Sequence, residues 1–370
     1  MRQLVLSLAL SLVASAAPGF EIEELVQFPA ENETAELRVI STADTELFAP
    51  FILEFQQANP GISVAYHVVS TTELMIALAE EGESFDLAIS SAMDLQVKLA
   101  NDGLARPYQS VQTAALPPWA RWHGQVFAFT QEPATMVLSR AAFEGLPLPR
   151  TRQELITVLR DNPDRFAGRI GTYDVRVSGL GYLFATQDGR TSETFWRLAE
   201  VMGSLQTRLY CCSGAMIEDV ASGEIAVAYN VLGSYAQARA DLHDAIHIIA
   251  PQDFTTVMLR TVLIPETATL PDQAGAFIDH LIQTSWLRPD NGFAFPGITG
   301  EGLSGNAGLR PIALGPGLLV YLDRLKRDIG DTHGQGRGTG AHGAAPGSGA
   351  VSEGHRQPAA HVPSCGLRCR

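Results

Sequence analysis

The sequence predicts an α/β protein with a mainly parallel sheet, organised as two domains. From Leu37 onward, short apolar runs typical of strands alternate with amphipathic helical stretches, and this alternation is typical of parallel sheets. The chain has 370 residues, which favours two domains over one. Its 46% hydrophobic and 18% charged residues are ordinary for a globular protein.

The expected elements follow in chain order. In the first block we expect strands at 38–40, 62–69 and 86–89, and helices at 45–57, 71–80 and 92–101. In a middle block, 127–247, we expect a helix and strand within 151–174, helices at 194–203 and from 215, and a strand at 225–230. The chain then returns to strands over 245–265 and closes with helices at 272–284 and 315–327.

Both ends of the chain differ from this body. A positive start, an apolar run over 4–13 and the Ala14-Ser15-Ala16 triplet predict a secretory signal peptide at 1–16, and therefore a periplasmic protein. Residues 17–36 are acidic and weakly patterned, so we expect a flexible leader. Residues 331–370 hold nine Gly and no aromatic residue, so we expect a disordered tail.

Charge and motifs exclude several classes of function. The formal net charge is −14, and −17 for the body between signal peptide and tail, so nucleic-acid binding is not expected. His243 and His247 have the spacing of a zinc-binding helix, but their stretch has the pattern of a strand, so we expect no metal site. No P-loop or nucleophile elbow is present, so we expect no enzyme and no cofactor.

Four cysteines are present, Cys211, Cys212, Cys365 and Cys369. An export signal permits disulfides, but the sequence does not choose among the three possible pairings. A bond between the adjacent Cys211 and Cys212 would need a strained ring, so we expect both to be free or buried.

Five turns rich in small and polar residues follow the expected strands. They are STADT at 41–45, SSAMD at 90–94, TYDVRVSGLG at 172–181, CSGAM at 212–216 and NVLGSYA at 230–236. One such turn only caps a helix, and STADT is expected to do so. Because carboxyl ends of parallel strands share one edge of a sheet, five of them together indicate a ligand crevice.

The order of four blocks carries a resemblance to a known family. The blocks are RVISTADTELFAPFILEFQQANPGISVAY, GESFDLAISSAMDLQVKLANDGLA, VASGEIAVAYNVLGSYAQARA and APQDFTTVMLRTVLIP. Over about 37–327 the chain resembles the extracellular solute-binding proteins of ABC importers, in the branch of ferric-iron, phosphonate and sugar-phosphate binders. The resemblance implies a type II periplasmic binding protein fold, with a ligand cleft between two α/β lobes. Lobe one would be 37–127 plus 248–330, and lobe two 128–247.

The resemblance also implies which residues contact the ligand. They are Ser41, Thr42, Asp44, Thr45, Ser90, Ser91 and Ala92 in lobe one, and Ser178, Gly179, Ser213, Gly214, Asn230, Gly233, Ser234 and Tyr235 in lobe two. Arg176 and Arg310 are candidate counter-charges for an anion. Ferric binders of this branch use two adjacent tyrosines, whereas Tyr235 lacks a tyrosine neighbour and Tyr229 is expected to point elsewhere.

We therefore expect a monomeric periplasmic receptor for a small anionic solute, either a carboxylate or a phosphate or phosphonate. Its partner would be an inner-membrane ABC permease. Three alternatives remain open at this stage: a ligand-presenting partner of a two-component sensor kinase, a ferric-iron binding protein, and a secreted enzyme on the same scaffold, for which only Asp44 or Cys212 offers a reactive group.

Overall fold

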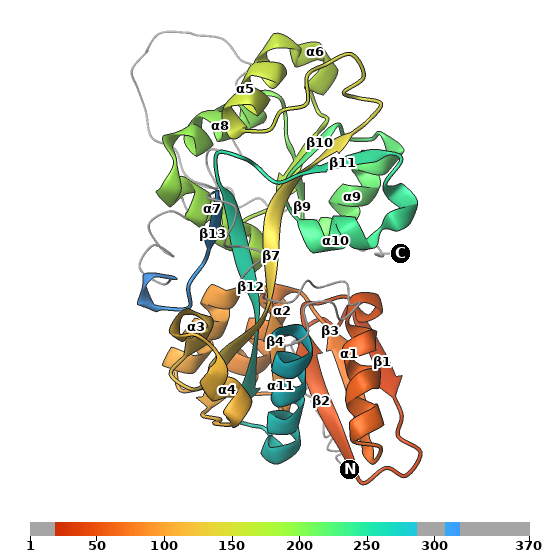
Figure 1. Ribbon diagram of the computed structural model, residues 1–370, viewed down its shortest axis with the longest axis vertical. Coiled ribbons are helices and arrows are strands. Elements are labelled where there is room, and N and C mark those ends of the chain that lie inside the picture. Colours follow the sequence, from red (N-terminus) through yellow and green to blue (C-terminus); the bar gives the residue numbers. More distant parts are fainter. Residues whose placement is uncertain (1–18, 287–307, 319–370) are drawn as a thin grey trace, which may run out of the picture.

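Two α/β lobes joined by two long strands make up the computed structural model, which describes residues 19–286 and 308–318 (Figure 1). The joining strands are β7 (Val126–Ser139) and β12 (Thr255–Pro265). The expected signal peptide, the tail and most of the helix expected at 315–327 lie outside the described residues. Within the described residues, no helix is both long and apolar enough to cross a bilayer.

Lobe one holds most of the N-terminal elements together with one late helix. Its strands are β1 (Glu24–Phe28), β2 (Ala35–Ser41), β3 (Ile62–Val68), β4 (Leu87–Ser90), β5 (Ala105–Arg106) and β6 (Arg121–Trp122), while β13 (Leu309–Pro311) pairs with the first residues of β12 between the lobes. Its helices are α1 (Thr45–Ala58), α2 (Thr71–Met75), the π-helical turn η1 (Ile76–Glu80), α3 (Met93–Asn101), α4 (Val111–Ala115), η2 (Pro118–Ala120) and α11 (Pro271–Trp286).

Lobe two is built from the middle of the chain. Its helices are α5 (Arg152–Asp161), α6 (Pro163–Phe166), α7 (Gly179–Thr191), α8 (Glu193–Ser204), α9 (Ser213–Ser222), α10 (Gly233–Ala238) and η3 (Ala240–Leu242). Its strands are β8 (Ile170–Tyr173), β9 (Arg208–Tyr210), β10 (Val227–Leu232) and β11 (Ile246–Ile249). The short helical turn η4 (Pro316–Leu318) ends the described chain.

The sheet is continuous through both lobes, in the order β1-β3-β2-β4-β12-β7-β10-β8-β9. The pairs β2–β3, β2–β4, β8–β10 and β8–β9 are parallel, as the alternation of strands and helices predicts. However, β7 and β12 run antiparallel to each other, and β12 runs antiparallel to β4. The sheet is therefore mixed, because the chain crosses from one lobe to the other and returns.

An aromatic cluster anchors α1 on the sheet of lobe one. Phe48, Phe51 and Phe55 recur at helical spacing on one face of α1 and are fully buried. Phe48 stacks on Tyr66 of β3 with ring centroids 5.3 Å apart, and Phe55 meets Phe277 of α11 at 4.6 Å. This packing holds α1 in place on lobe one, and therefore also fixes the position of its first turn, which faces lobe two.

The expected flexible leader is partly wrong, because β1 forms within it. β1 pairs antiparallel with β3, from Glu24 opposite Val68 to Phe28 opposite Val64. The Gln56 side chain donates to the Phe28 carbonyl at 2.9 Å, and the Thr45 hydroxyl donates to the Glu24 carboxylate at 2.6 Å. A weak sequence pattern suffices here, since an edge strand needs only one neighbour to pair with its backbone.

A buried polar network fixes the interior of lobe two. Arg152 is fully buried and donates to the Tyr229 hydroxyl at 2.6 Å and to Asp188 at 3.1 Å. Asp188 also accepts from Tyr229 at 2.7 Å and from the Asn230 amide at 3.0 Å. The expectation that Tyr229 points away from Tyr235 is therefore confirmed.

Both lobe boundaries expected from the sequence fall inside strands. The boundary expected at 127/128 falls inside β7, and the one expected at 247/248 falls inside β11. We propose that the lobes divide within β7 and β12 themselves, since these two strands pair with strands of both lobes.

Candidate ligand-binding site

Two turns of lobe one lie side by side at the edge of the sheet. They follow the parallel neighbours β2 and β4, and the Thr42 hydroxyl accepts from the Ser91 amide at 3.2 Å. Ser41 and Ser90 each accept from the backbone amide two residues on, at 3.1 Å in both cases. The Tyr66 hydroxyl donates to Ser41 at 2.7 Å. The structure thus brings together the lobe-one residues that the sequence predicts, although most of their hydroxyls also hold the turns in shape.

Asp44 stands where α1 begins, facing lobe two. It occupies the N-cap position, yet its carboxylate makes no capping hydrogen bond, so the expectation that STADT caps the helix through its side chains is wrong. Its backbone amide donates instead to the Tyr235 hydroxyl of lobe two, at 3.4 Å. Asp44 is exposed as a residue, although the protein around its carboxylate excludes enough water to raise its pKa. Thr45 turns away from lobe two, toward Glu24.

The lobe-two turns face the same junction. Ser178 caps α7 by accepting from the Gly181 amide at 3.1 Å. The Ser213 hydroxyl meets that of Tyr173 at 2.5 Å and accepts from the Leu232 amide at 3.3 Å. These serines are engaged inside lobe two, so the group that the α7 turn directs at lobe one is a backbone amide, that of Gly179.

Direct contacts join the two lobes at α2 and α7. The Gly179 amide donates to the Thr71 hydroxyl at 2.7 Å, and the Thr72 hydroxyl donates to the Val177 carbonyl at 3.1 Å. Gly179 allows the close approach, because a Cβ there would lie 2.9 Å from the Thr71 hydroxyl oxygen and 3.0 Å from a Leu95 methyl. The two lobes are therefore closed against each other along this edge.

A buried ion pair that is not among the residues predicted from the sequence lies beneath the junction. Arg260 of β12 donates to Glu132 of β7 at 2.8 and 3.2 Å, and both side chains are 0% exposed. The Ser234 hydroxyl donates to Glu132 at 2.5 Å, and the Arg260 guanidinium lies 6.0 Å from the centre of the Tyr235 ring. Ser234 and Tyr235 of the expected site are therefore placed over this pair. A charged residue inside each of two apolar runs could have drawn attention to it.

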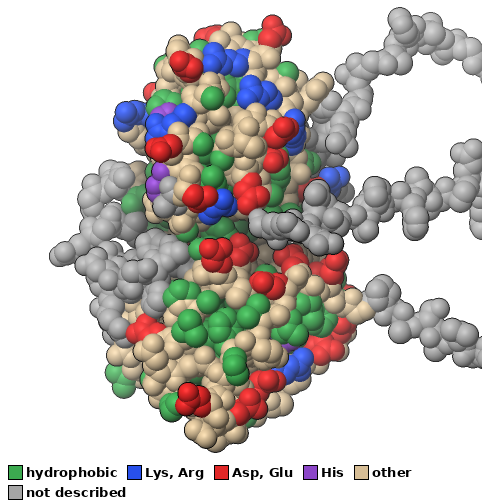
Figure 2. Space-filling model, turned by 90° about the vertical axis from the view of Figure 1, so that its right-hand side faces the viewer, with side chains coloured by type: hydrophobic (Ala, Val, Ile, Leu, Met, Phe, Trp, Pro, Cys, Tyr) green, Lys and Arg blue, Asp and Glu red, His purple; other side chains and the backbone are tan. Residues whose placement is uncertain are grey.

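The acidic groups at the junction influence one another. The pKa of Asp44 is raised above its ordinary value, mainly by burial. The positive charge of Arg260 opposes this increase, and the negative charges of Glu24 and Glu46 add to it. Burial also raises the pKa of Glu23, followed by the charges of Asp44 and Glu21. Figure 2 shows acidic side chains on both sides of the waist between the lobes. Because Asp44 itself stands at the start of α1, a ligand anion would be favoured at the other helix starts rather than at that of α1.

Other candidates lie away from this junction or have local partners. Asn230 has φ +64° and donates to Asp188 inside lobe two. Arg176 forms an ion pair with Asp174 at 2.6 Å, and its side chain is 69% exposed. Arg310 is exposed and lies over Phe254 at 4.7 Å. Both arginines therefore have local partners in this arrangement.

The remaining predicted residues are small and shape the backbone. Ala92 is buried as the residue before α3. A Cβ at Gly233 would lie 2.8 Å from Thr135, whereas one at Gly214 would meet nothing within 4 Å. Gly214 therefore leaves open space at the start of α9, next to the lobe-two serines.

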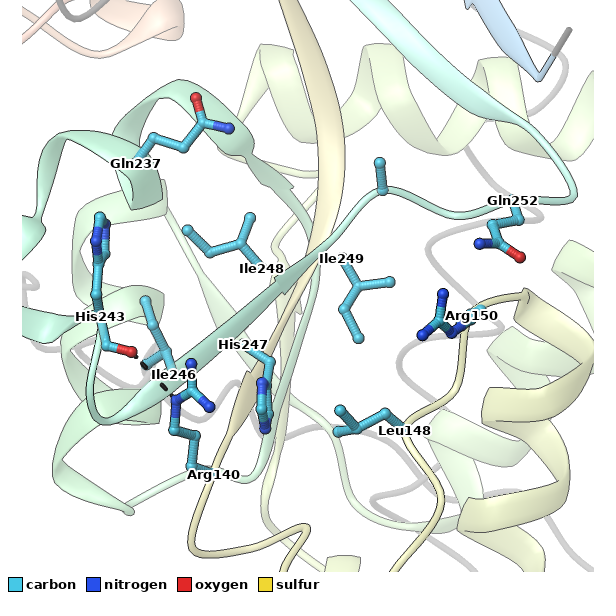
Figure 3. A pocket seen from close by; sticks show the side chains of 11 residues that line it. Arg140, Leu148, Arg150, Gln237, His243, Ile246, His247, Ile248, Ile249 and Gln252 are labelled. Carbon is cyan, nitrogen blue, oxygen red and sulfur yellow. Dashed lines mark hydrogen bonds between the residues drawn. The ribbon is translucent and has the colours of Figure 1, made fainter. Parts of the chain in front are cut away.

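A groove of about 550 Å³ lies along β11 on lobe two, and it contains none of the predicted ligand residues (Figure 3). Its lining includes Arg140, Arg150, His243 and His247. His247 lies in β11 and His243 precedes it, so the two imidazoles do not share a helix, as the sequence predicts. In the part of the chain that the structure describes, no three His, Cys, Asp or Glu side chains are grouped to hold a metal.

Comparisons with known proteins found similar solved structures, whereas no protein-family model matches the chain. The chain is similar to the substrate-binding protein of an ABC transporter from Agrobacterium tumefaciens, with 33% identity and a TM-score of 0.77, covering 86% of this chain and 100% of that one. It is also similar to iron-bound HitA from Pseudomonas aeruginosa (18% identity, TM-score 0.62, covering 80% and 99%). A third match is AfuA from Actinobacillus pleuropneumoniae, solved with fructose-6-phosphate. It has 16% identity and a TM-score of 0.58, and the match covers 68% of this chain and 80% of that one. At these identities the last two show the fold alone.

Proposed function

Because this chain belongs to the substrate-binding proteins of ABC transporters, we propose that it is a periplasmic receptor for a small anionic solute. It would bind the solute between its lobes as a monomer, without turnover, and deliver it to an inner-membrane permease. The predicted signal peptide at 1–16 supports export. The family itself, and the type II fold that the sequence resemblance implied, are confirmed by the comparisons.

One observation carries the choice of an anion. The starts of α1 and α3 in lobe one lie beside each other and beside α10 of lobe two, through the Thr42–Ser91 and Asp44–Tyr235 hydrogen bonds, and the Gly179 amide at the start of α7 reaches Thr71 of lobe one. Helix starts present free N–H groups and a positive dipole end, which favour carboxylates and phosphates. Hydroxyl groups near these helix starts are uncharged and can donate further hydrogen bonds to an anion.

Iron is disfavoured by the state of the tyrosines. Tyr235 has no tyrosine neighbour in the sequence, and the Tyr229 hydroxyl is engaged inside lobe two by Arg152 and Asp188. Ferric iron would need phenolates or carboxylates gathered as hard oxygen ligands. The alternative of a ferric-iron binding protein is therefore less well supported than an organic or phosphate anion.

Thermal unfolding with a ligand panel tests this proposal. The mature chain is first unfolded and refolded to remove any bound solute, then heated with hexose phosphates, phosphoglycerate, alkylphosphonates, citrate, ferric nitrilotriacetate or a quaternary ammonium compound. Ligand at about 100 times its Kd adds about 2.7 kcal/mol of stability, which raises Tm by several degrees. We expect a shift with one class of anion. A shift with iron alone, or with the cation alone, would contradict the proposal.

Closure of the two lobes should strengthen the affinity of the protein for its anionic ligand. We expect Gly179→Ala to weaken binding of the identified anion about tenfold or more, because the added methyl group must displace Thr71 or Leu95 when the lobes close. Isothermal titration calorimetry measures the change. Gly317→Ala is the matched control, since it is exposed and its Cβ would meet nothing within 4 Å. Equal affinities for wild type and Gly179→Ala would show that closure at α2 and α7 is not required.

A further inference from the structure

The turn before α9 holds two thiols in contact. Cys211 directly follows β9, and Cys212 occupies the N-cap position of α9. Neither of the two is in a disulfide in the described part of the chain, and their sulfur atoms lie 3.2 Å apart. Cys211 is exposed and Cys212 is partly buried. The pair is therefore accessible to a reagent from solvent, mainly through Cys211.

This contact does not follow from adjacency in sequence. In extended backbone, successive side chains point to opposite sides, and Cys212 has extended dihedral angles, φ −145° and ψ 160°. The bend that begins at Cys211 nevertheless turns both sulfurs to the same side. A disulfide needs sulfurs about 2.05 Å apart, so these two sulfurs must approach further, and the strain of the ring that they close makes the bond easily reduced.

Cys211 is also suited to begin such a reaction. Its hydrogen bond with Cys212 lowers the pKa of the Cys211 thiol to about 7, against burial and the charges of Glu23 and Asp44, which raise it. A substantial fraction is therefore thiolate at neutral pH, and the thiolate is the reactive form. Because the charges of Glu23 and Asp44 act on this thiol, the dithiol of lobe two lies within electrostatic range of acidic groups of lobe one.

We propose that Cys211 and Cys212 form a redox-active dithiol that closes to a vicinal disulfide by exchange with an external disulfide. The Cys211 thiolate attacks one sulfur of that disulfide, which forms a mixed disulfide and releases one thiolate. The Cys212 thiolate then attacks the Cys211 sulfur, which closes the ring and releases the second thiolate. The protein loses two electrons and two protons, and the external disulfide is reduced to two thiols. A periplasm maintains such oxidants.

Closure of the ring would act on the proposed ligand site, and this part of the inference rests on the proposed function. The dithiol precedes Ser213 and Gly214 in the same turn. Oxidation removes the partial negative charge of the Cys211 thiolate from the start of α9. Since like charges repel an anionic ligand, the oxidised protein should bind the anion about two- to fivefold more tightly at pH 8.

Counting thiols across glutathione redox buffers tests the ring itself. The full mature chain carries Cys365→Ser and Cys369→Ser, so that only the two thiols of the turn react. After equilibration, acid quenching, denaturation and alkylation, intact mass spectrometry counts the labels. We expect two labels in reducing buffer, and in oxidising buffer an unlabelled monomer lighter by two hydrogens, mapped to the peptide that contains both cysteines. Two labels at every buffer ratio, or a disulfide-linked dimer, would overturn the proposal.

Single variants separate the two steps. With Cys212→Ser the ring cannot close, so we expect a stable glutathione adduct on Cys211 in oxidising buffer, with an unchanged circular dichroism spectrum. The same adduct in the chain that retains both thiols would overturn ring closure. Calorimetry of the oxidised and reduced forms with the identified anion tests the effect on affinity: equal Kd values overturn that effect, while the thiol count still decides the disulfide and the ligand panel still decides the function.

Discussion

Replacing Arg260 by methionine is expected to lower the free energy of unfolding by about 3–5 kcal/mol, because it leaves a buried carboxylate without its cation. Arg260 and Glu132 are both 0% exposed and share two hydrogen bonds between β12 and β7. The remaining donors to Glu132, the hydroxyls of Thr130 and Ser234, cannot neutralise its charge. Urea unfolding of the mature protein measures the loss.

A double-mutant cycle distinguishes charge pairing from lost packing. Glu132→Gln keeps an oxygen for the two hydroxyls, so Glu132→Gln with Arg260→Met should cost less than the sum of the single changes, by about 1–3 kcal/mol. Lys98→Met is the matched control: Lys98 and Asp102 form an exposed ion pair on α3, which contributes about 0–1 kcal/mol. Additive costs in the cycle would show that packing, rather than the buried charge, is responsible.

Replacing Asp94 by asparagine is expected to stabilise the protein at pH 8 by about 2–4 kcal/mol. Asp94 lies in the first turn of α3 and is 1% exposed, and among the described residues its Oδ1 has no hydrogen-bond partner. Burial raises the pKa of this carboxyl to about 7, against hydrogen bonds from the backbone amides. Each unit of pKa difference corresponds to about 1.4 kcal/mol.

The pH profile gives the sign of this effect. The pKa of Asp94 is higher in the folded state than its ordinary value of 3.8, so the folded state binds the proton more tightly. Its contribution to stability is fully present below about pH 3.8 and is lost as pH rises toward about 7. Asp94→Asn should remove this loss, so the two urea unfolding curves should diverge between pH 5 and pH 8. Asp161→Asn, an exposed change on α5, should shift stability by less than about 0.5 kcal/mol. Parallel profiles for wild type and Asp94→Asn would contradict the prediction.

Local sequence patterns predicted most helices and strands of this fold. The features that the sequence did not predict depend on contacts between residues that are distant in the chain. The spacing of Phe48, Phe51 and Phe55 predicts α1, because a helix buries one face regardless of its partner. β1 has no comparable pattern, since it forms only by pairing with β3, about 40 residues away. The same applies to Arg260 and Glu132, which are 128 positions apart and meet only through the register of β7 and β12.

Within the candidate site, turns were easier to predict than side-chain directions. The turns after β2 and β4 meet because parallel neighbours end at the same edge, so Thr42 and Ser91 could be placed together from the order of strands alone. Arg176 was chosen for its charge, but Asp174 lies two positions away and forms an ion pair with it. Asn230 was chosen for its turn, but its amide is used by Asp188 inside the lobe.

The antiparallel pairing of β7 and β12 also has a consequence for how such proteins change over time. Pro133 lies opposite Val257, and Glu132 lies opposite Met258, so the chain enters and leaves lobe two at adjacent points. Among the described residues, lobe two is therefore one uninterrupted segment whose two ends lie side by side. A single genetic exchange at this place can replace the whole segment as a cassette. Such an exchange alters one half of the solute-binding surface and leaves the other half in its original sequence.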